Sequence, residues 1–194
     1  MTMTTSILRR FFAPSAKRSG GVGGVNPGPC TRYADMGTLS LVEVSDASAI
    51  AGALFTKAFN VDIPRFPRHF VMFRRTEAGT PLVLGYVHYT RNEDEYLAGG
   101  LVVAALEFRK LDAQTAALVR RAGGLAEWTM RTTCSWLECN AVFAYMGDAK
   151  SILVNTRVGF VATPHKYLYV MWKRRLTSEA QSELVARVAA IGPF

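Results

Sequence analysis

From residue 39 onward, short apolar runs alternate with polar turns rich in glycine and proline. The alternation in LSLVEV predicts a strand over 39–44, and a polar Ser-Asp cap precedes a helix over 46–59 with apolar positions near helical spacing. The runs at 69–76 and 81–90 are joined by the turn EAGT and predict an antiparallel hairpin.

The second half of the chain continues the pattern. The run LVVAALEF, residues 101–108, is almost continuously apolar, which predicts a central strand buried on both faces. A helical region over 112–139 is interrupted at Gly123 and Gly124. The remaining elements that we expect are a strand at 141–146, a helix at 148–158, strands at 160–162 and 167–172, and a last helix at 178–191. This order predicts a domain of the α/β (α+β) class.

Residues 1–36 differ from the rest. They are rich in Gly, Pro, Ser and Thr, have no acid before Asp35 and show no sustained apolar period, so we expect a disordered basic tail. It is either an organelle transit peptide or, as we favour, an overlong translation start before Met36. We expect a folded domain over 37–176 and a C-terminal helical extension over 177–194.

Composition narrows the classes of protein. With 49% hydrophobic residues, 194 residues suffice for one core, and no apolar run approaches the roughly 18 residues of a membrane span. We therefore expect a soluble, cytoplasmic protein with no membrane contact; a homodimer is compatible with the sequence.

Of the net charge of +8, residues 1–34 hold +5. Because a nucleic-acid binder needs a clustered basic face on a folded element, that function is a minor alternative that would depend on the tail.

The cysteines and histidines do not suggest a metal. Three cysteines, at 30, 134 and 139, form neither a disulfide framework nor paired zinc spacing, and the three histidines are scattered. We expect no metal and a reduced environment. Cys134 or Cys139 as a nucleophile would need a partner histidine, and none is well placed in the sequence.

The glycine pair in RAGGLAEW opens a predicted helix. The first N–H groups of a helix lack partners and carry partial positive charge, so they can bind a phosphate or pyrophosphate. Gly123 and Gly124 leave the backbone accessible, and Arg120 and Arg121 add positive charge. The alternative is that the two glycines only permit a bend.

Two motifs carry a resemblance to a known family. Arg121, Gly124 and Ala126 match the pattern [Q/R]-x-x-G-x-[G/A], and the helix at 148–158 ends in Gly-Phe. With the order of elements, the chain from about 39 to 172 resembles the GNAT superfamily of acyl-CoA N-acyltransferases. The resemblance implies a mixed, mostly antiparallel central sheet flanked by helices, and acetyl-CoA as co-substrate. It also implies that the pyrophosphate is held by the backbone of Arg121, Ala122, Gly123, Gly124, Leu125 and Ala126.

The same resemblance implies a reaction. An amine on an unidentified acceptor would attack the thioester directly, with the pantetheine arm held by the backbone near Val103 and Ala104. Glu107 would be the general base, at the end of the central strand. The acceptor is expected near the loop at 60–69 and the hairpin that bears His88 and Tyr89.

Two departures from the family concern catalysis. Where the family often has Asn and, further along the helix, a Tyr that protonates the leaving thiolate, this chain has Asp148 and Asn155. An amide cannot deliver a proton as a phenol does, so Tyr145 is the candidate substitute. The alternative function is a catalytically inactive coenzyme A-binding or protein-interaction domain of the same fold.

Overall fold

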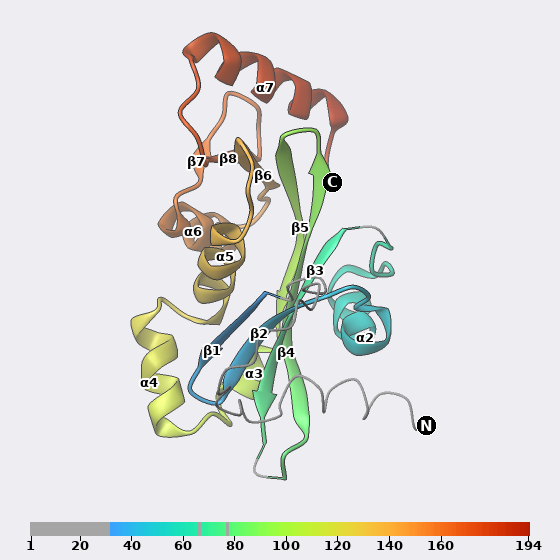
Figure 1. The fold of residues 1–194 in the computed structure, drawn as a ribbon, viewed down its shortest axis with the longest axis vertical. Coiled ribbons are helices and arrows are strands. Elements are labelled where there is room, and N and C mark those ends of the chain that lie inside the picture. The colour runs from blue at the N-terminus through green and yellow to red at the C-terminus, as the bar shows by residue number, and fades with distance from the viewer. Residues whose placement is uncertain (1–31, 66, 77) are drawn as a thin grey trace, which may run out of the picture.

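A computed structural model describes residues 32–65, 67–76 and 78–194. Its centre is an eight-stranded sheet in the order β1-β2-β3-β4-β5-β6-β8-β7 (Figure 1). Neighbouring strands are antiparallel except β5 and β6, which are parallel. The expected fold class, a mixed and mostly antiparallel sheet flanked by helices, is confirmed.

The elements have the following bounds. The strands are β1 (Tyr33–Met36), β2 (Leu39–Val44), β3 (Arg68–Arg75), β4 (Pro81–Asn92), β5 (Glu95–Val103), β6 (Ala141–Tyr145), β7 (Val161–Ala162) and β8 (Leu168–Trp172). The helices are α2 (Ser48–Phe59), α3 (Ala105–Phe108), α4 (Ala113–Arg121), α5 (Leu125–Ser135), α6 (Ala149–Val158) and α7 (Ser178–Ile191).

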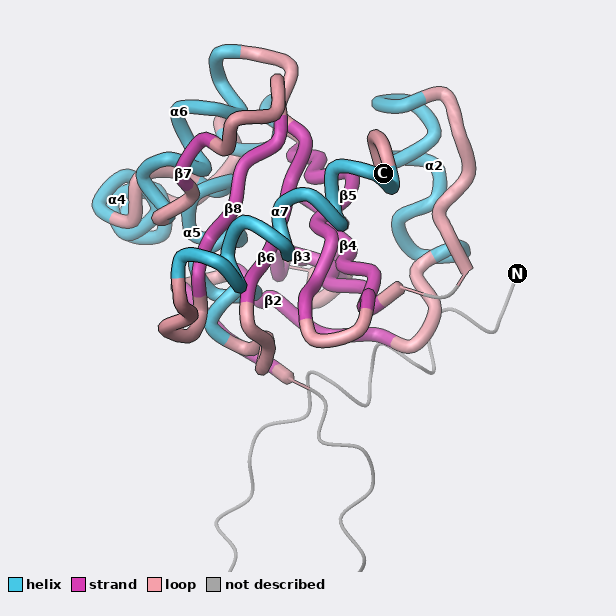
Figure 2. Tube along the Cα trace, turned by 90° about the horizontal axis from the view of Figure 1, so that it is seen from above, coloured by secondary structure: helices cyan, strands magenta, loops and turns pink. Residues whose placement is uncertain are grey.

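Helices cover both faces of the sheet. Helices α4, α5 and α6 pack on one face, which we call the α5 face, and α2 and α7 share the other, the α2 face (Figure 1). Figure 2 shows α7 running across β6 and β8. Because side chains alternate along a strand, Val87 and Tyr89 point to the α5 face, whereas Tyr86 points to the α2 face. The α2 face is thus covered in two separate halves.

The central strand was placed wrongly from the sequence. Strand β5 begins at Glu95, directly after the tight turn at residues 93–94, and ends at Val103. Residues 105–108 form the short helix α3, and Leu106 is 72% exposed. The apolar run was therefore not a strand buried on both faces, because its second half leaves the sheet.

The folded part also begins earlier than expected. Residues 33–36, assigned to the tail, form β1, which pairs antiparallel with β2. Asp35 fixes this pairing, since its carboxylate accepts a hydrogen bond of 2.6 Å from the Ser40 hydroxyl. The predictions for residues 1–31 lie outside the described residues.

Helix α7 packs closely on the sheet. Leu184, Val185 and Val188 are buried against β6 and β8. No helix in the described part of the chain is long and apolar enough to cross a membrane.

Candidate functional site

Strands β5 and β6 separate in the middle of the sheet. Their parallel pairing covers residues 95–98 of β5 and 141–144 of β6, and then stops. Beyond it, β5 remains paired with β4 and β6 with β8. The backbone groups that β5 turns toward β6 lose their strand partner here, and a cleft of about 300 Å³ opens between the strands, which we call the splay cleft.

A β-bulge accompanies the separation. His88 of β4 lies opposite Gly99 and Tyr86 opposite Val102, so that Gly100 and Leu101 together face the single residue Val87. Gly100 has a φ of +52°, and a Cβ added there would lie 2.3 Å from the Phe55 ring. Only glycine suits this position. Two glycines inside a strand are the sequence signal for such a bulge, and the sequence analysis missed it.

The cleft passes from one face of the sheet to the other. On the α5 face it is lined by apolar side chains, including Leu101, Met130 and Met146, and on the α2 face by Phe59. The ionisable residues that line it, among those described, are Tyr145 and Asp148. The cleft can therefore accept a long, mostly apolar group. Among the residues that the structure describes, such a group would encounter a charged side chain only at Asp148, near the mouth of the cleft.

Asp148 begins helix α6. Its carboxylate accepts hydrogen bonds from the backbone N–H groups of Ser151 (3.0 Å) and Lys150 (2.9 Å), which lower its pKa. Tyr145, the candidate acid, does line the cleft; its ring lies 5.1 Å from that of Phe194. Asn155, further along α6, lines the cleft as well and is only 6% exposed.

An aromatic cluster underlies the bulge on the α2 face. His88 packs against Phe55 and Tyr86, at ring distances of 5.7 Å. Burial lowers the pKa of His88 to about 4, so its ring is neutral at neutral pH. The Tyr89 hydroxyl lies on the other face, 2.6 Å from Thr133 Oγ1 in the core, so Tyr89 does not face the expected acceptor side with His88.

The glycine turn precedes α5 as expected. Gly124 is the N-cap residue with a φ of +108°. The N–H groups of the first three helical residues, 125 to 127, have no hydrogen-bond acceptor among the described residues. The side chains of Arg120 and Arg121 end the preceding helix on its exposed side. Met130, which lines the cleft, lies on the same helix, about 7.5 Å further along its axis at 1.5 Å per residue.

A carboxylate that the sequence analysis did not consider lies at this turn. Glu127 is 7% exposed, and its Oε2 atom is only 2.1 Å from where a Cβ on Gly123 would lie. Arg131 donates to Glu127 Oε1 at 2.8 Å. An acid in the first turn suits the helix dipole, and this rule could have identified Glu127.

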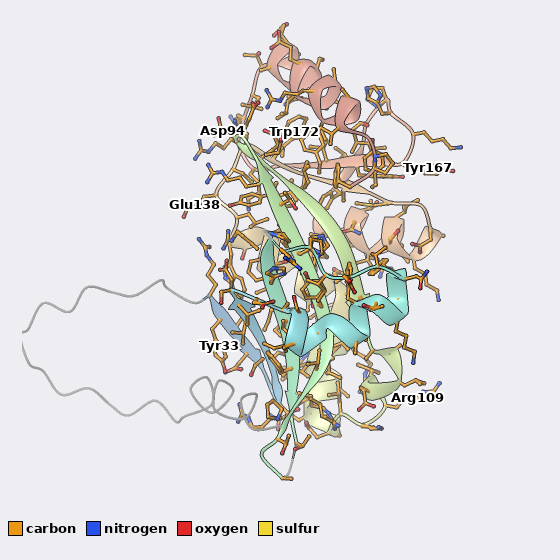
Figure 3. All side chains as sticks on the ribbon, turned by 90° about the vertical axis from the view of Figure 1, so that its right-hand side faces the viewer. Tyr33, Asp94, Arg109, Glu138, Tyr167 and Trp172 are labelled. Carbon is orange, nitrogen blue, oxygen red and sulfur yellow. The ribbon has the colours of Figure 1, made fainter. Side chains whose placement is uncertain are left out.

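Glu107 does not lie where the sequence placed it. It belongs to α3, and its carboxylate pairs with Lys110 at 2.7 Å and Arg74 at 3.5 Å. Arg109, just past α3, lies far from Tyr167 and Trp172 in Figure 3. Because Glu107 does not line the splay cleft, the structure does not support it as the base.

Val103 and Ala104 also lie beyond the cleft. Val103 is paired with Gly85 of β4, and the Ala104 N–H donates to the Leu84 carbonyl at 2.7 Å. The part of β5 that lines the cleft is residues 98–101. The error follows from placing the strand six residues too late.

The two described cysteines, Cys134 and Cys139, are buried and lack the environment of an activated nucleophile. Cys134 is buried beside the Tyr89 hydroxyl, and burial raises the pKa of its thiol to about 12. Among the described residues, no group of three His, Cys, Asp or Glu side chains could hold a metal ion.

Comparisons with known proteins complete the description. No protein-family model matches the chain, and a comparison with curated proteins finds no match. A mutant of the AtaT toxin bound to the C-terminus of the antitoxin AtaR is 16% identical, with a TM-score of 0.40, over 77% of this chain and 98% of the other. The ribosomal-protein-alanine N-acetyltransferase of Escherichia coli is 10% identical, with a TM-score of 0.43, over 72% and 97%. Tetrahymena GCN5 is 12% identical, with a TM-score of 0.41, over 65% of this chain and 86% of the other.

At identities of 10–16% and TM-scores of 0.40–0.43, these likenesses leave both the family and the chemistry of the chain to be argued from the residues of the cleft.

Proposed function

We propose that the chain is an acetyl-CoA-dependent N-acetyltransferase whose reaction takes place in the splay cleft. The observation that carries the proposal is the loss of pairing between β5 and β6 beyond Ala98 and Ala144, which opens a cleft in the sheet beside Met130 of α5. The acceptor would bind on the α2 face, between α2 and α7, and its chemical identity is left open.

The residues present fit the proposed co-substrate. The apolar lining of the cleft suits a pantetheine arm, and the three free N–H groups at the start of α5, with Arg120 and Arg121, suit a pyrophosphate. The negative charge of Glu127 opposes a second anion there, but its ion pair with Arg131 makes the pair neutral. We expect binding that is weakened by Glu127 but not prevented.

Acetyl-CoA would supply an activated acyl thioester. The backbone groups of residues 99–101 that lack a strand partner could polarise a carbonyl oxygen, since N–H groups fixed by the bulge need not reorganise. Asp148, exposed at the mouth, could hold a cationic amine, which must lose a proton to solvent before its nitrogen attacks the thioester carbonyl. Tyr145 is the candidate donor of a proton to the thiolate that leaves. The His88 ring lies against Gly99 and is neutral, because burial lowers its pKa to about 4. It would therefore place no charge beside this part of the cleft.

The second candidate is a coenzyme A-binding domain without transfer activity. It is favoured by Asn155, which lines the cleft where the family resemblance implies a tyrosine and which cannot donate a titrating proton. The two candidates predict the same binding and differ only in turnover.

A titration calorimetry experiment with the full chain and acetyl-CoA tests the site. Gly147 lines the cleft, and a Cβ there meets no atom within 4 Å, so Gly147→Leu should narrow the cleft without straining the fold. We expect it to weaken binding at least tenfold. Gly52→Leu, on α2 and equally unobstructed, is the matched control and should bind as the wild type does.

Release of free thiol in the presence of a panel of amines separates the two candidates. Turnover above the rate of hydrolysis supports the transferase, and tight binding without turnover supports the binding domain. No binding by the folded wild type would rule out both.

A further inference from the structure

One buried atom in the splay cleft lacks a hydrogen-bond partner. The side-chain oxygen Oδ1 of Asn155 is inaccessible to solvent, and no described residue donates to it. Buried polar atoms are paired in the great majority of cases, and an unpaired one costs free energy. The Arg74 Nε and His88 Nδ1 atoms are also unpaired, but neither residue lines the cleft.

The orientation of the Asn155 amide follows from its other contact. Its Nδ2 atom lies 2.9 Å from the backbone carbonyl of Ser151. A carbonyl can only accept, so the amide nitrogen must be the atom that faces it, and the reverse orientation would bring two oxygens together. Oδ1 is therefore an acceptor directed away from the backbone of α6.

The chemistry of the surroundings selects the donor. On this face the cleft is apolar, since Met130 and Met146 belong to its lining and to the core, so a neutral donor is favoured over a charged one. A cationic amine would instead meet Asp148, whose exposed carboxylate lies at the mouth. Asn155 also lies on the α5 face, as does the glycine turn, and so on the side of the co-substrate.

We propose that Oδ1 of Asn155 accepts a hydrogen bond from one of the two amide N–H groups of the pantetheine arm, which makes Asn155 a binding residue for the co-substrate. This inference rests on the proposed function. It explains why an unpaired acceptor is kept in a buried position, because the ligand completes its hydrogen bonding. It also gives α6 a role in holding the arm and none in protonating a leaving group.

The test uses the full chain and three probes: coenzyme A and two analogues in which one or the other pantetheine amide is replaced by an ester, which has no N–H. We expect the wild type to bind one ester analogue about tenfold more weakly than coenzyme A. Asn155→Leu, of similar volume, should bind coenzyme A about tenfold more weakly and should no longer distinguish that analogue from it. Thr156→Val, an exposed change on the same helix, is the control and should behave as the wild type.

Thermal unfolding without ligand provides a second readout. Asn155→Leu removes the unpaired buried acceptor together with the Nδ2 hydrogen bond to the Ser151 carbonyl, two effects of opposite sign, so its unfolding temperature should stay close to that of the wild type. A purely structural role predicts a lower unfolding temperature with unchanged discrimination between the probes.

The outcomes separate the two proposals. If the wild type binds coenzyme A but binds both ester analogues equally well, the inference is overturned while the proposed function stands, and this comparison requires no variant to fold. The inference is also overturned if Asn155→Leu keeps the preference of the wild type. If the folded wild type binds none of the probes, the proposed function fails first.

Discussion

Arg187 of α7 donates to both carboxylate oxygens of Glu95, at 3.0 and 3.2 Å, and Glu95 is completely buried at the start of β5. Asn92 Nδ2 donates to the same carboxylate at 2.7 Å. The ion pair attaches the last helix to the strand that forms one wall of the splay cleft. A residue range that the sequence analysis described as an extension is thus joined to the centre of the sheet.

Loss of this pair should destabilise the fold. Arg187→Met leaves the Glu95 carboxylate buried without its cation, which costs up to about 5 kcal/mol for a fully buried pair. Because the Arg187 side chain is 46% exposed, we expect a loss of about 2 kcal/mol in the free energy of unfolding, measured by urea denaturation. The double variant Arg187→Met/Glu95→Gln should recover part of the loss, and equal losses in both would contradict this explanation.

Removing the charge of Glu127 should strengthen anion binding. Glu127→Gln keeps the shape of the side chain, removes a negative charge beside the start of α5 and releases Arg131. We expect about 5- to 10-fold tighter binding of coenzyme A in calorimetry. Glu138→Gln, a change at an exposed carboxylate after α5, is the control. Unchanged affinity in Glu127→Gln would show that the phosphates do not bind at this turn.

The bulge should tolerate only glycine at position 100. In Gly100→Ala the new methyl group would clash with the Phe55 ring, and the alanine would have to adopt the positive φ of this position. We therefore expect a loss of about 2–4 kcal/mol in the free energy of unfolding. Gly52→Ala, inside α2 with open space around it, should instead stabilise by about 0.5–1 kcal/mol. Chemical denaturation of the two variants measures both effects. A neutral Gly100→Ala would mean that the bulge can relax.

His88 should make the fold sensitive to acid. Its pKa is about 4 in the folded chain, against 6.5 for a free histidine, because the buried ring resists protonation. Between these values the unfolded chain binds more protons, so stability falls as the pH drops from about 6.5 to about 4, by about 3 kcal/mol. His88→Gln should flatten the pH dependence of urea unfolding in this window, whereas His165→Gln, at an exposed position, should not. Equal slopes in His88→Gln and the wild type would refute this role.

The sequence was most informative where one short segment decides the outcome. Alternation predicted β2, and apolar runs bounded by polar turns predicted β3, β4 and β6, all close to their observed bounds, because each signal lies within the strand and its flanking turns. The glycine motif predicted the turn before α5, because a positive φ at Gly124 is a local requirement. The end of α6 at Gly159 was predicted in the same way, and the structure adds that Asp148 caps its start.

The site itself was decided by contacts between distant segments. The apolar run at 101–108 could be a strand or a helix on its own, and its second half leaves the sheet, where Glu107 of α3 pairs with Arg74 of β3. Paired in this way, Glu107 lies outside the cleft. The partners of a carboxylate depend on which strands and helices meet, and no local pattern encodes them.

The sequence by itself determined most of the elements, their order along the chain and the glycine turn before α5, because these depend on neighbours within a few residues. The tertiary structure alone decided that β5 and β6 separate after four paired residues, that Asn155 is buried in the resulting cleft with an unpaired oxygen, and that Glu127 lies against Gly123. The physical reason is that burial and strand pairing are properties of the packed sheet. They set the hydrogen-bonding and charge of each side chain through residues that are remote in the sequence.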